Sequence, residues 1–278
     1  MNLSIRKFIV LPEIYASLGT LFPEHLSLYR GHIMFGFGFD SGNKDFKVVV
    51  LVPGWYKNPL IAPVEVYVYS LASGQWRSIK DGVPSIFSCS HLSSKRSLTF
   101  VNGALHWVFC GKCNNQRRPS FISTFDLAEE TFGETMLPNC WDDESCFHPS
   151  LLVRGSCLAL AYRKKDSEGS DVMYIWVMKE YGAVDSWNLV RCVNLRHYPR
   201  IQRIIALRSS EEMVVKVIGG MLFLLDNDLE KPKAAKDLEL RQYEVGFAAD
   251  HVESLFLIKQ KYKSYVKDFV DVRFVSPK

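Results

Sequence analysis

A short motif that recurs at a constant distance constrains the fold of this chain more than any other feature. A leucine followed five residues later by an aromatic residue occurs in Leu71–Trp76 and again in Leu127–Phe132, and a looser copy ends at Trp187. The aromatic residues are 56 and then 55 residues apart. Repeats of about 50 residues that each supply four strands are typical of β-propeller blades. A single blade cannot bury both of its faces, so such repeats must stack on one another.

Tight turns between short strands point to the same class of fold. Asn102-Gly103, Arg154-Gly155 and Gly219-Gly220 each separate two runs of strand-forming residues, and Asn-Gly or Gly-Gly supplies the positive φ of a hairpin turn. Helical periodicity is nearly absent, and only residues 13–29 and 234–243 fit short helices. The chain is therefore expected to be all-β.

Composition excludes several classes of protein. Of the 278 residues, 47% are hydrophobic and 23% are charged, which excludes an intrinsically disordered chain. A net charge of +4 is too small to indicate nucleic-acid or membrane binding. No apolar run reaches the roughly 18 residues of a transmembrane helix, and the apolar run Phe8–Leu11 is too short for a signal peptide. The seven cysteines lack a disulfide-framework spacing, so they are expected to be free thiols in the cytoplasm, the nucleus or both.

The strand pattern predicts three complete blades and the start of a fourth, each built from the ring centre outward. The expected strands of the first blade are residues 34–39, 46–52, 64–70 and 75–79, those of the second are 98–101, 104–109, 121–126 and 131–137, and those of the third are 151–153, 157–162, 172–178 and 187–193. The fourth is expected to begin with residues 213–217 and 221–225. A β-sandwich with chance internal similarity is the alternative fold, but matched spacing at a constant period favours the propeller.

A series of motifs in this sequence resembles one family over nearly the whole chain. The motifs, in order, are Ser4-Ile5-Arg6-Lys7, Phe35-Gly36-Phe37-Gly38-Phe39-Asp40, Asp45-Phe46-Lys47-Val48-Val49, Val101-Asn102-Gly103-Ala104-Leu105-His106-Trp107, Ile175-Trp176-Val177-Met178-Lys179-Glu180-Tyr181-Gly182 and Val252-Glu253-Ser254-Leu255. The chain resembles the F-box-associated, kelch-like β-propeller domain of plant F-box proteins. The resemblance implies a single domain over residues 1–278, in which residues 1–12 are the outer strand of a truncated blade and residues 33–260 hold the remaining blades.

The resemblance also implies a function. Such a propeller is the substrate-recognition module of an SCF-type E3 ubiquitin ligase, and it binds a target protein. A separate F-box would bind the Skp-type adaptor and, through it, the cullin. This sequence starts where the family has already passed its F-box and the first strands of the ring, so the propeller is expected to be incomplete at its N-terminus and residues 1–278 alone are not expected to bind the adaptor.

Two other function classes stay open as alternatives, a propeller enzyme and a nucleic-acid-binding propeller. No catalytic constellation is found, and the acidic run Asp142-Asp143-Glu144 has no matched partner. The pair Cys110 and Cys113 has metal-like spacing, but structural zinc needs four ligands and no second pair follows. Tyrosines interleave with lysines over residues 259–267, as in some single-strand binders. No cofactor, metal, membrane or nucleic acid is therefore expected.

Loop lengths predict where a target protein would bind. Strand direction alternates along a blade, so the connections after the second and fourth strands emerge at one end of the ring. These connections are expected to be the long ones, at residues 53–63, 80–97, 110–120, 138–150, 163–170 and 194–212. They carry side chains of the types enriched at interface hot spots, namely Trp55, Tyr56, Arg117, Arg118 and Trp141. The alternative for Trp55 and Trp141 is that each folds back to cover the core.

Overall fold

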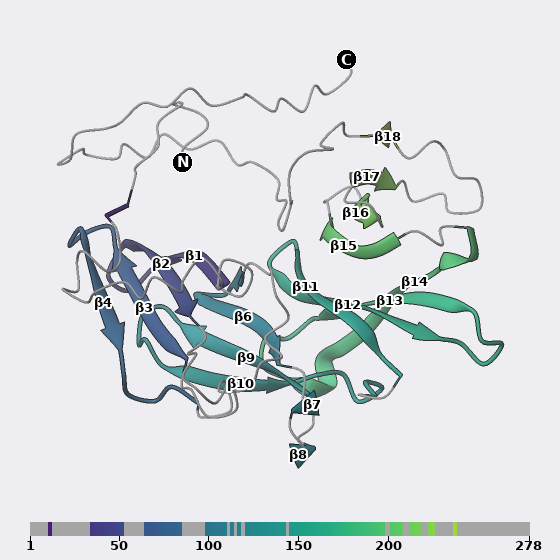
Figure 1. Ribbon diagram of the computed structural model, residues 1–278, viewed down its shortest axis with the longest axis horizontal. Helices are drawn as coiled ribbons and strands as arrows, with labels where there is room; N and C mark the ends of the chain where they lie inside the picture. The colour runs from purple at the N-terminus through teal and green to yellow at the C-terminus, as the bar shows by residue number, and fades with distance from the viewer. Residues whose placement is uncertain are drawn as a thin grey trace, which may run out of the picture.

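Four antiparallel sheets make up the fold. The computed structural model describes residues 11–12, 34–52, 64–84, 98–109, 112–113, 116–117, 120–142, 145–197, 201–207, 212–217, 222–225 and 236–237. In each sheet four strands follow one another in chain order from one edge to the other (Figure 1). We refer to the sheets as blades 1 to 4. The described residues thus confirm the predicted all-β fold of four-stranded blades.

The strands have the following bounds. Blade 1 contains β1 (Met34–Asp40), β2 (Asp45–Val52), β3 (Glu65–Ser70) and β4 (Gln75–Ile79). Blade 2 contains β5 (Thr99–Val101), β6 (Ala104–Phe109), β9 (Phe121–Asp126) and β10 (Phe132–Met136), and a small hairpin of β7 (Lys112–Cys113) and β8 (Gln116–Arg117) lies between β6 and β9. Blade 3 contains β11 (Phe147–Arg154), β12 (Cys157–Lys165), β13 (Asp171–Met178) and β14 (Trp187–Asn194). Blade 4 contains β15 (Ile201–Leu207), β16 (Met213–Val217), β17 (Leu222–Leu225) and β18 (Lys236–Asp237).

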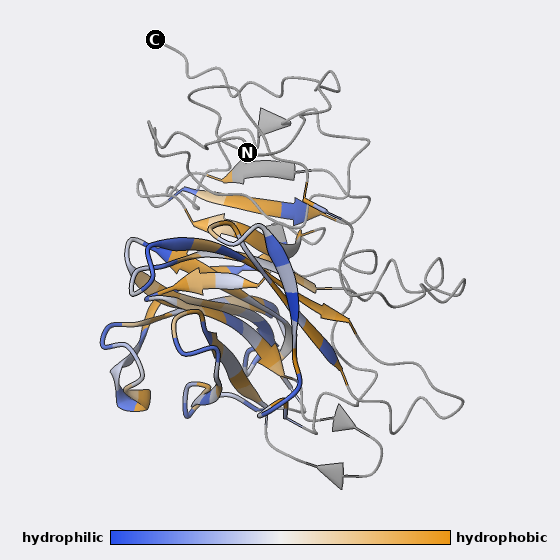
Figure 2. Ribbon diagram, turned by 90° about the vertical axis from the view of Figure 1, so that its left-hand side faces the viewer, coloured by the Kyte–Doolittle hydropathy of each residue, from blue (hydrophilic) through white to orange (hydrophobic). Residues whose placement is uncertain are grey.

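Neighbouring blades are held together by the apolar clusters between them. Leu51 of blade 1 shares one cluster with Leu105 of blade 2, Ile122 of blade 2 shares a second with Leu160 of blade 3, and a third joins blades 3 and 4. The inner strands β1, β5, β11 and β15 contact one another in that order. Figure 2 shows the result, with hydrophobic strands in the interior and hydrophilic turns at its left-hand edge. Burial between blades, which removes apolar surface from water, stabilises the stack.

The predicted strands of blades 1 to 3 agree with the structure to within a few residues. The three aromatic residues that set the repeat also lie at equivalent places, at the start of the outer strands β4, β10 and β14. Trp76 pairs with Tyr69, Phe132 with Phe125, and Trp187 with Met178 of the third strand. The register predicted from the motif spacing is therefore confirmed.

The prediction for blade 4 was wrong by one strand. Its first strand is β15, which lies inside the segment 194–212 that was expected to be a long connection, and β16 and β17 are the second and third strands. Two register shifts in the pairing of β15 with β16 interrupt the alternation of apolar and polar residues, which hides this strand in the sequence. As a consequence, Gly219-Gly220 joins the second and third strands and is not equivalent to Asn102-Gly103.

The structure also differs from the predicted connection at 163–170 and from the predicted helix at 234–243. The connection expected at 163–170 is shorter, because β12 continues to Lys165 and a tight turn with Gly169 at φ 77° follows. The Asp166 carboxylate holds this turn by accepting hydrogen bonds from the backbone N–H groups of Glu168 and Ser170. The helix expected at 234–243 is wrong at Lys236–Asp237, which pair with β17 as strand β18. The helix expected at 13–29 lies outside the described residues.

Candidate functional site

The two ends of blades 1 to 3 differ in the length of their connections. Tight turns join the first strand to the second at 41–44, 102–103 and 155–156, and we call this end the turn face. The connections that follow second and fourth strands emerge at the other end, and the longest of them are 53–64, 80–98, 110–120 and 137–146. We call these four connections the loop face. Loops on a rigid scaffold are the usual carriers of binding function.

The structure describes two of the five predicted contact residues. Arg117 lies on β8 of the small hairpin in the connection 110–120. Strand β8 lies at the lower edge of Figure 1. Trp141 lies in the connection 137–146 between blades 2 and 3. Trp55, Tyr56 and Arg118 lie outside the described residues. Of the predicted contact residues, the structure thus describes one in the connection 110–120 and one in the connection 137–146.

The Trp141 side chain packs against the core, as the alternative for this residue expects. Its indole packs edge-on against the Tyr162 ring, with ring centroids 5.1 Å apart and an interplanar angle of 79°. Its backbone N–H donates to the carbonyl of Pro138 at 2.8 Å, which closes the turn. The side chain is half-buried at the edge of the cluster shared by blades 2 and 3. Trp141 therefore covers part of the core from a connection of the loop face.

The Tyr162 ring that contacts Trp141 is itself held by a second tyrosine and a cysteine. Tyr162 stacks on Tyr174 with centroids 5.7 Å apart, and its hydroxyl lies 3.3 Å from the Cys140 Sγ. Burial, together with the contact to Cys140, raises the pKa of the Tyr162 hydroxyl, and burial raises the pKa of the Cys146 thiol. Both groups are therefore protonated at neutral pH. This chemistry suits packing better than nucleophilic catalysis, which needs a thiolate.

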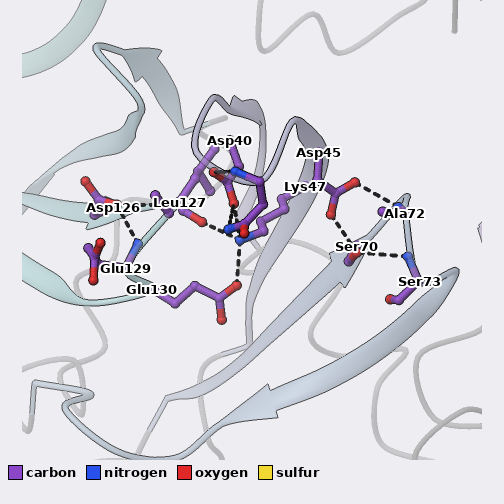
Figure 3. A network of polar contacts seen from close by, with 12 residues as sticks. Asp40, Asp45, Lys47, Ser70, Ala72, Ser73, Asp126, Leu127, Glu129 and Glu130 are labelled. Atoms are coloured by element: carbon purple, nitrogen blue, oxygen red, sulfur yellow. Dashed lines mark hydrogen bonds and ion pairs between the residues drawn. The ribbon is translucent and has the colours of Figure 1, made fainter.

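A charged network lies on the turn face, between blades 1 and 2 (Figure 3). The buried Lys47 ammonium contacts the carboxylates of Asp40 at 2.7 Å and Glu130 at 2.8 Å, and it also donates to the Leu127 carbonyl. Arg77 pairs with Glu130 as well. Burial alone would raise the pKa of Asp40, but hydrogen bonds from Lys47 and Asn43 outweigh it and lower the pKa to about 2. The network joins blades 1 and 2 through Lys47 and Glu130. No motif in the sequence indicates this role for Lys47.

A buried histidine connects blades 2 and 3. The Nδ1 of His106 lies 3.1 Å from the Thr99 carbonyl and its Nε2 lies 2.8 Å from the Tyr181 hydroxyl. Because a carbonyl only accepts, Nδ1 carries the proton and Nε2 accepts from Tyr181. Burial lowers the pKa of His106 below its ordinary value of 6.5, so the ring is neutral. The Nδ1 contact stays within blade 2, whereas the Nε2 contact to Tyr181 links blade 2 to blade 3.

The described ranges offer neither a metal centre nor a membrane-spanning helix. Within them, no group of three His, Cys, Asp or Glu side chains is arranged to hold a metal ion. Cys110 of the metal-like pair lies outside those ranges, and Cys113 lies on β7. No helix of the described part of the chain is long and apolar enough to cross a membrane.

Comparison with known proteins gives a consistent result. Residues 21–265 match the F-box associated beta propeller domain. F-box protein CPR1 of Arabidopsis thaliana is 26% identical over 248 residues, which cover 82% of this chain and 57% of that protein. From the same plant, F-box/kelch-repeat protein At3g23880 is 29% identical over 156 residues, 56% of this chain and 38% of that protein. F-box protein At4g22390 is 30% identical over 181 residues, 60% of this chain and 41% of that protein.

The chain spans 57% or less of the length of these relatives. The family match covers most of the chain, and the described residues form successive four-stranded blades, as a propeller requires. The chain belongs to the F-box associated β-propeller domain family.

Proposed function

We propose that this propeller recognises a target protein through its loop face, as the substrate-recognition part of an SCF-type ubiquitin ligase. The relatives named above are F-box proteins, which supports a role next to an adaptor-binding F-box. The observation that carries the proposal is the loop face itself. Its four connections open at one end of stacked blades, whereas short turns close the first hairpin of each blade at the other end.

The described residues on the loop face suit protein binding. Trp and Arg are the residue types most enriched at interface hot spots, and Trp141 and Arg117 lie on two of the four connections. Trp141 is already held against Tyr162, so little side-chain freedom is lost when a partner covers it. A rigid anchor of this kind contributes more net affinity than a mobile one, because the ordering cost is smaller.

Alanine substitutions on the loop face test the proposal. Proteins that bind the full chain are purified from plant tissue, and the dissociation constant of the main partner is measured for Trp55→Ala and Arg117→Ala. We expect each variant to bind at least about tenfold more weakly, which corresponds to about 1.4 kcal/mol. Trp141→Ala also removes a core contact, so Trp141→Phe is the informative change at that position.

Glu129→Ala provides the matched control, since Glu129 is exposed on the turn face. It should leave both affinity and melting temperature unchanged. The proposal fails if Trp55→Ala and Arg117→Ala both bind the partner like the unmodified chain, or if Glu129→Ala weakens binding as much as they do.

A further inference from the structure

Three of the four cysteines whose side chains the structure describes gather where blades 2 and 3 meet. The four are Cys140, Cys146, Cys157 and Cys192, and all of them are free thiols. Burial raises the pKa of the Tyr174 hydroxyl, and the thiols of Cys192, Cys146 and Cys140 raise it further. These three thiols therefore lie within electrostatic reach of one tyrosine ring. The fourth, Cys157, begins β12 at the turn-face end of blade 3.

Two of these thiols belong to one connection of the loop face, which folds back on itself. The Trp141 backbone N–H donates to the Pro138 carbonyl at 2.8 Å, and the Cys146 backbone N–H donates to the Asp142 carbonyl, also at 2.8 Å. Two turns therefore follow one another in this connection. The Cys146 Sγ accepts a hydrogen bond from the Asp142 backbone N–H at 3.4 Å. It thus lies beside the residue two positions after Cys140.

The Tyr162 hydroxyl shows that both thiols point to the same side of the connection. Its oxygen lies 3.3 Å from the Cys140 Sγ. Burial raises the pKa of this hydroxyl most, and the Cys140 and Cys146 thiols each raise it further. Because both sulfur atoms approach one small group, they also approach each other. A disulfide needs Cα atoms about 4.4–6.8 Å apart, a spacing that residues in consecutive turns can reach.

The surroundings of the two thiols differ in the way that a redox-responsive pair requires. Cys140 is exposed, so a small oxidant can reach it, whereas Cys146 is buried. Burial raises the pKa of the Cys146 thiol, and the Asp142 N–H and the Lys164 ammonium offset part of this increase. An accessible cysteine with a second thiol beside it is the usual arrangement in redox sensors, in which the first thiol is oxidised and the second resolves the product.

We propose that Cys140 and Cys146 form a disulfide when hydrogen peroxide oxidises the protein. The peroxide oxidises the Cys140 sulfur to a sulfenic acid and is itself reduced to water. The Cys146 sulfur then attacks the sulfenic sulfur, so that the S–S bond forms and the S–O bond breaks. The leaving hydroxide takes up the Cys146 proton as a second water. The product is a short covalent ring that contains Trp141, and a dithiol reductant opens it again.

Non-reducing peptide mapping of the full chain tests the proposal. The reduced chain is treated with hydrogen peroxide, the remaining thiols are alkylated, and cleavage after Glu144 separates Cys140 from Cys146 before mass spectrometry. The linked pair of peptides that carry Cys140 and Cys146 should be at least about tenfold more abundant than any link to Cys157 or Cys192. Dithiothreitol should abolish it.

Serine substitutions provide the control and separate the roles of the two thiols. Cys157→Ser, at the opposite end of blade 3, should leave the amount of linked pair unchanged. Cys146→Ser should remove the link and leave Cys140 to be oxidised further to a sulfinic acid. In the unsubstituted chain, a Cys140 that stays reduced or becomes a sulfinic acid would overturn the proposal. A predominant link from Cys140 to Cys192, or a link whose yield falls on dilution, would overturn it too.

Discussion

Two buried polar groups between blades, Lys47 and His106, determine how the domain should respond to mutation and pH. Lys47 has two carboxylates within 2.8 Å, and Asp40, the more buried of them, has a pKa of about 2. A buried carboxylate that loses its cation is far costlier than an exposed one, because water cannot replace the lost partner. The sequence could not predict this pairing, since Lys47 and Glu130 come from different repeats.

Lys47→Met should therefore destabilise the domain by about 3–5 kcal/mol. Urea unfolding at neutral pH measures the change, and Lys44→Met in the exposed neighbouring turn is the control.

The folded-state pKa of Asp40 lies below its ordinary value of 3.8, so its contribution of about 2 kcal/mol to the stability of the fold is present above pH 3.8 and is lost as pH falls toward about 2. Asp40→Asn should flatten this acid dependence, and an unchanged slope would show that Asp40 is not its source.

His106 should make the stability of the fold depend on pH in a second, higher range of pH. The pKa of His106 is lower in the folded protein than in the unfolded chain. Below pH 6.5 the unfolded chain therefore binds a proton that the folded protein does not. Stability is therefore fully present above pH 6.5 and decreases as pH falls below 6.5 toward the folded-state pKa. His106→Gln should remove this part of the slope in melting temperature between pH 7.5 and pH 5.5. NMR titration should show His106 with a pKa below 6.5, and a value above 6.5 would contradict the buried, neutral ring.

At the scale of the elements, blades 1 to 3 could be predicted and blade 4 could not. Buried and exposed residues alternate strictly along β1, and the turn at Asn102-Gly103 has the positive φ values, 49° and 80°, that its sequence favours. The register shifts in β15 break that alternation, so periodicity alone missed the strand.

The sequence placed Arg117 and Trp141 in the correct connections. Whether Trp141 covers the core depends on Tyr162, 21 positions away, which local patterns do not reveal.

Gly38 of β1 provides a test of how closely blades 1 and 2 pack. Gly38→Ala should force a Cβ into the Phe100 ring and cost about 1–3 kcal/mol, as overpacking of a tight core does. Gly42→Ala is the matched control, because its nearest neighbours lie at 3.4 and 3.8 Å, in ordinary contact, and its φ is not in the left-handed region. Thermal unfolding measures both variants. Equal melting temperatures would mean that blades 1 and 2 do not meet as closely as the structure places them.

At the scale of the whole molecule, the domain is a rigid stack with two unlike ends. The buried links of Lys47 and His106 hold adjacent blades together, and the longer connections of blades 1 to 3 gather on the loop face. Loops at such an end can vary without disturbing the interfaces between blades. Family membership, together with this asymmetry, leads to the proposed role in target recognition.

Hydrogen–deuterium exchange of the domain with and without its bound target protein tests that role most directly. We predict that binding slows exchange in peptides covering residues 110–120 and 137–146 of the loop face. Peptides from the turn face, at residues 71–74 and 127–131, should exchange at the same rate in both states. Protection confined to the turn face, with the loop-face peptides unchanged, would contradict the proposed recognition surface.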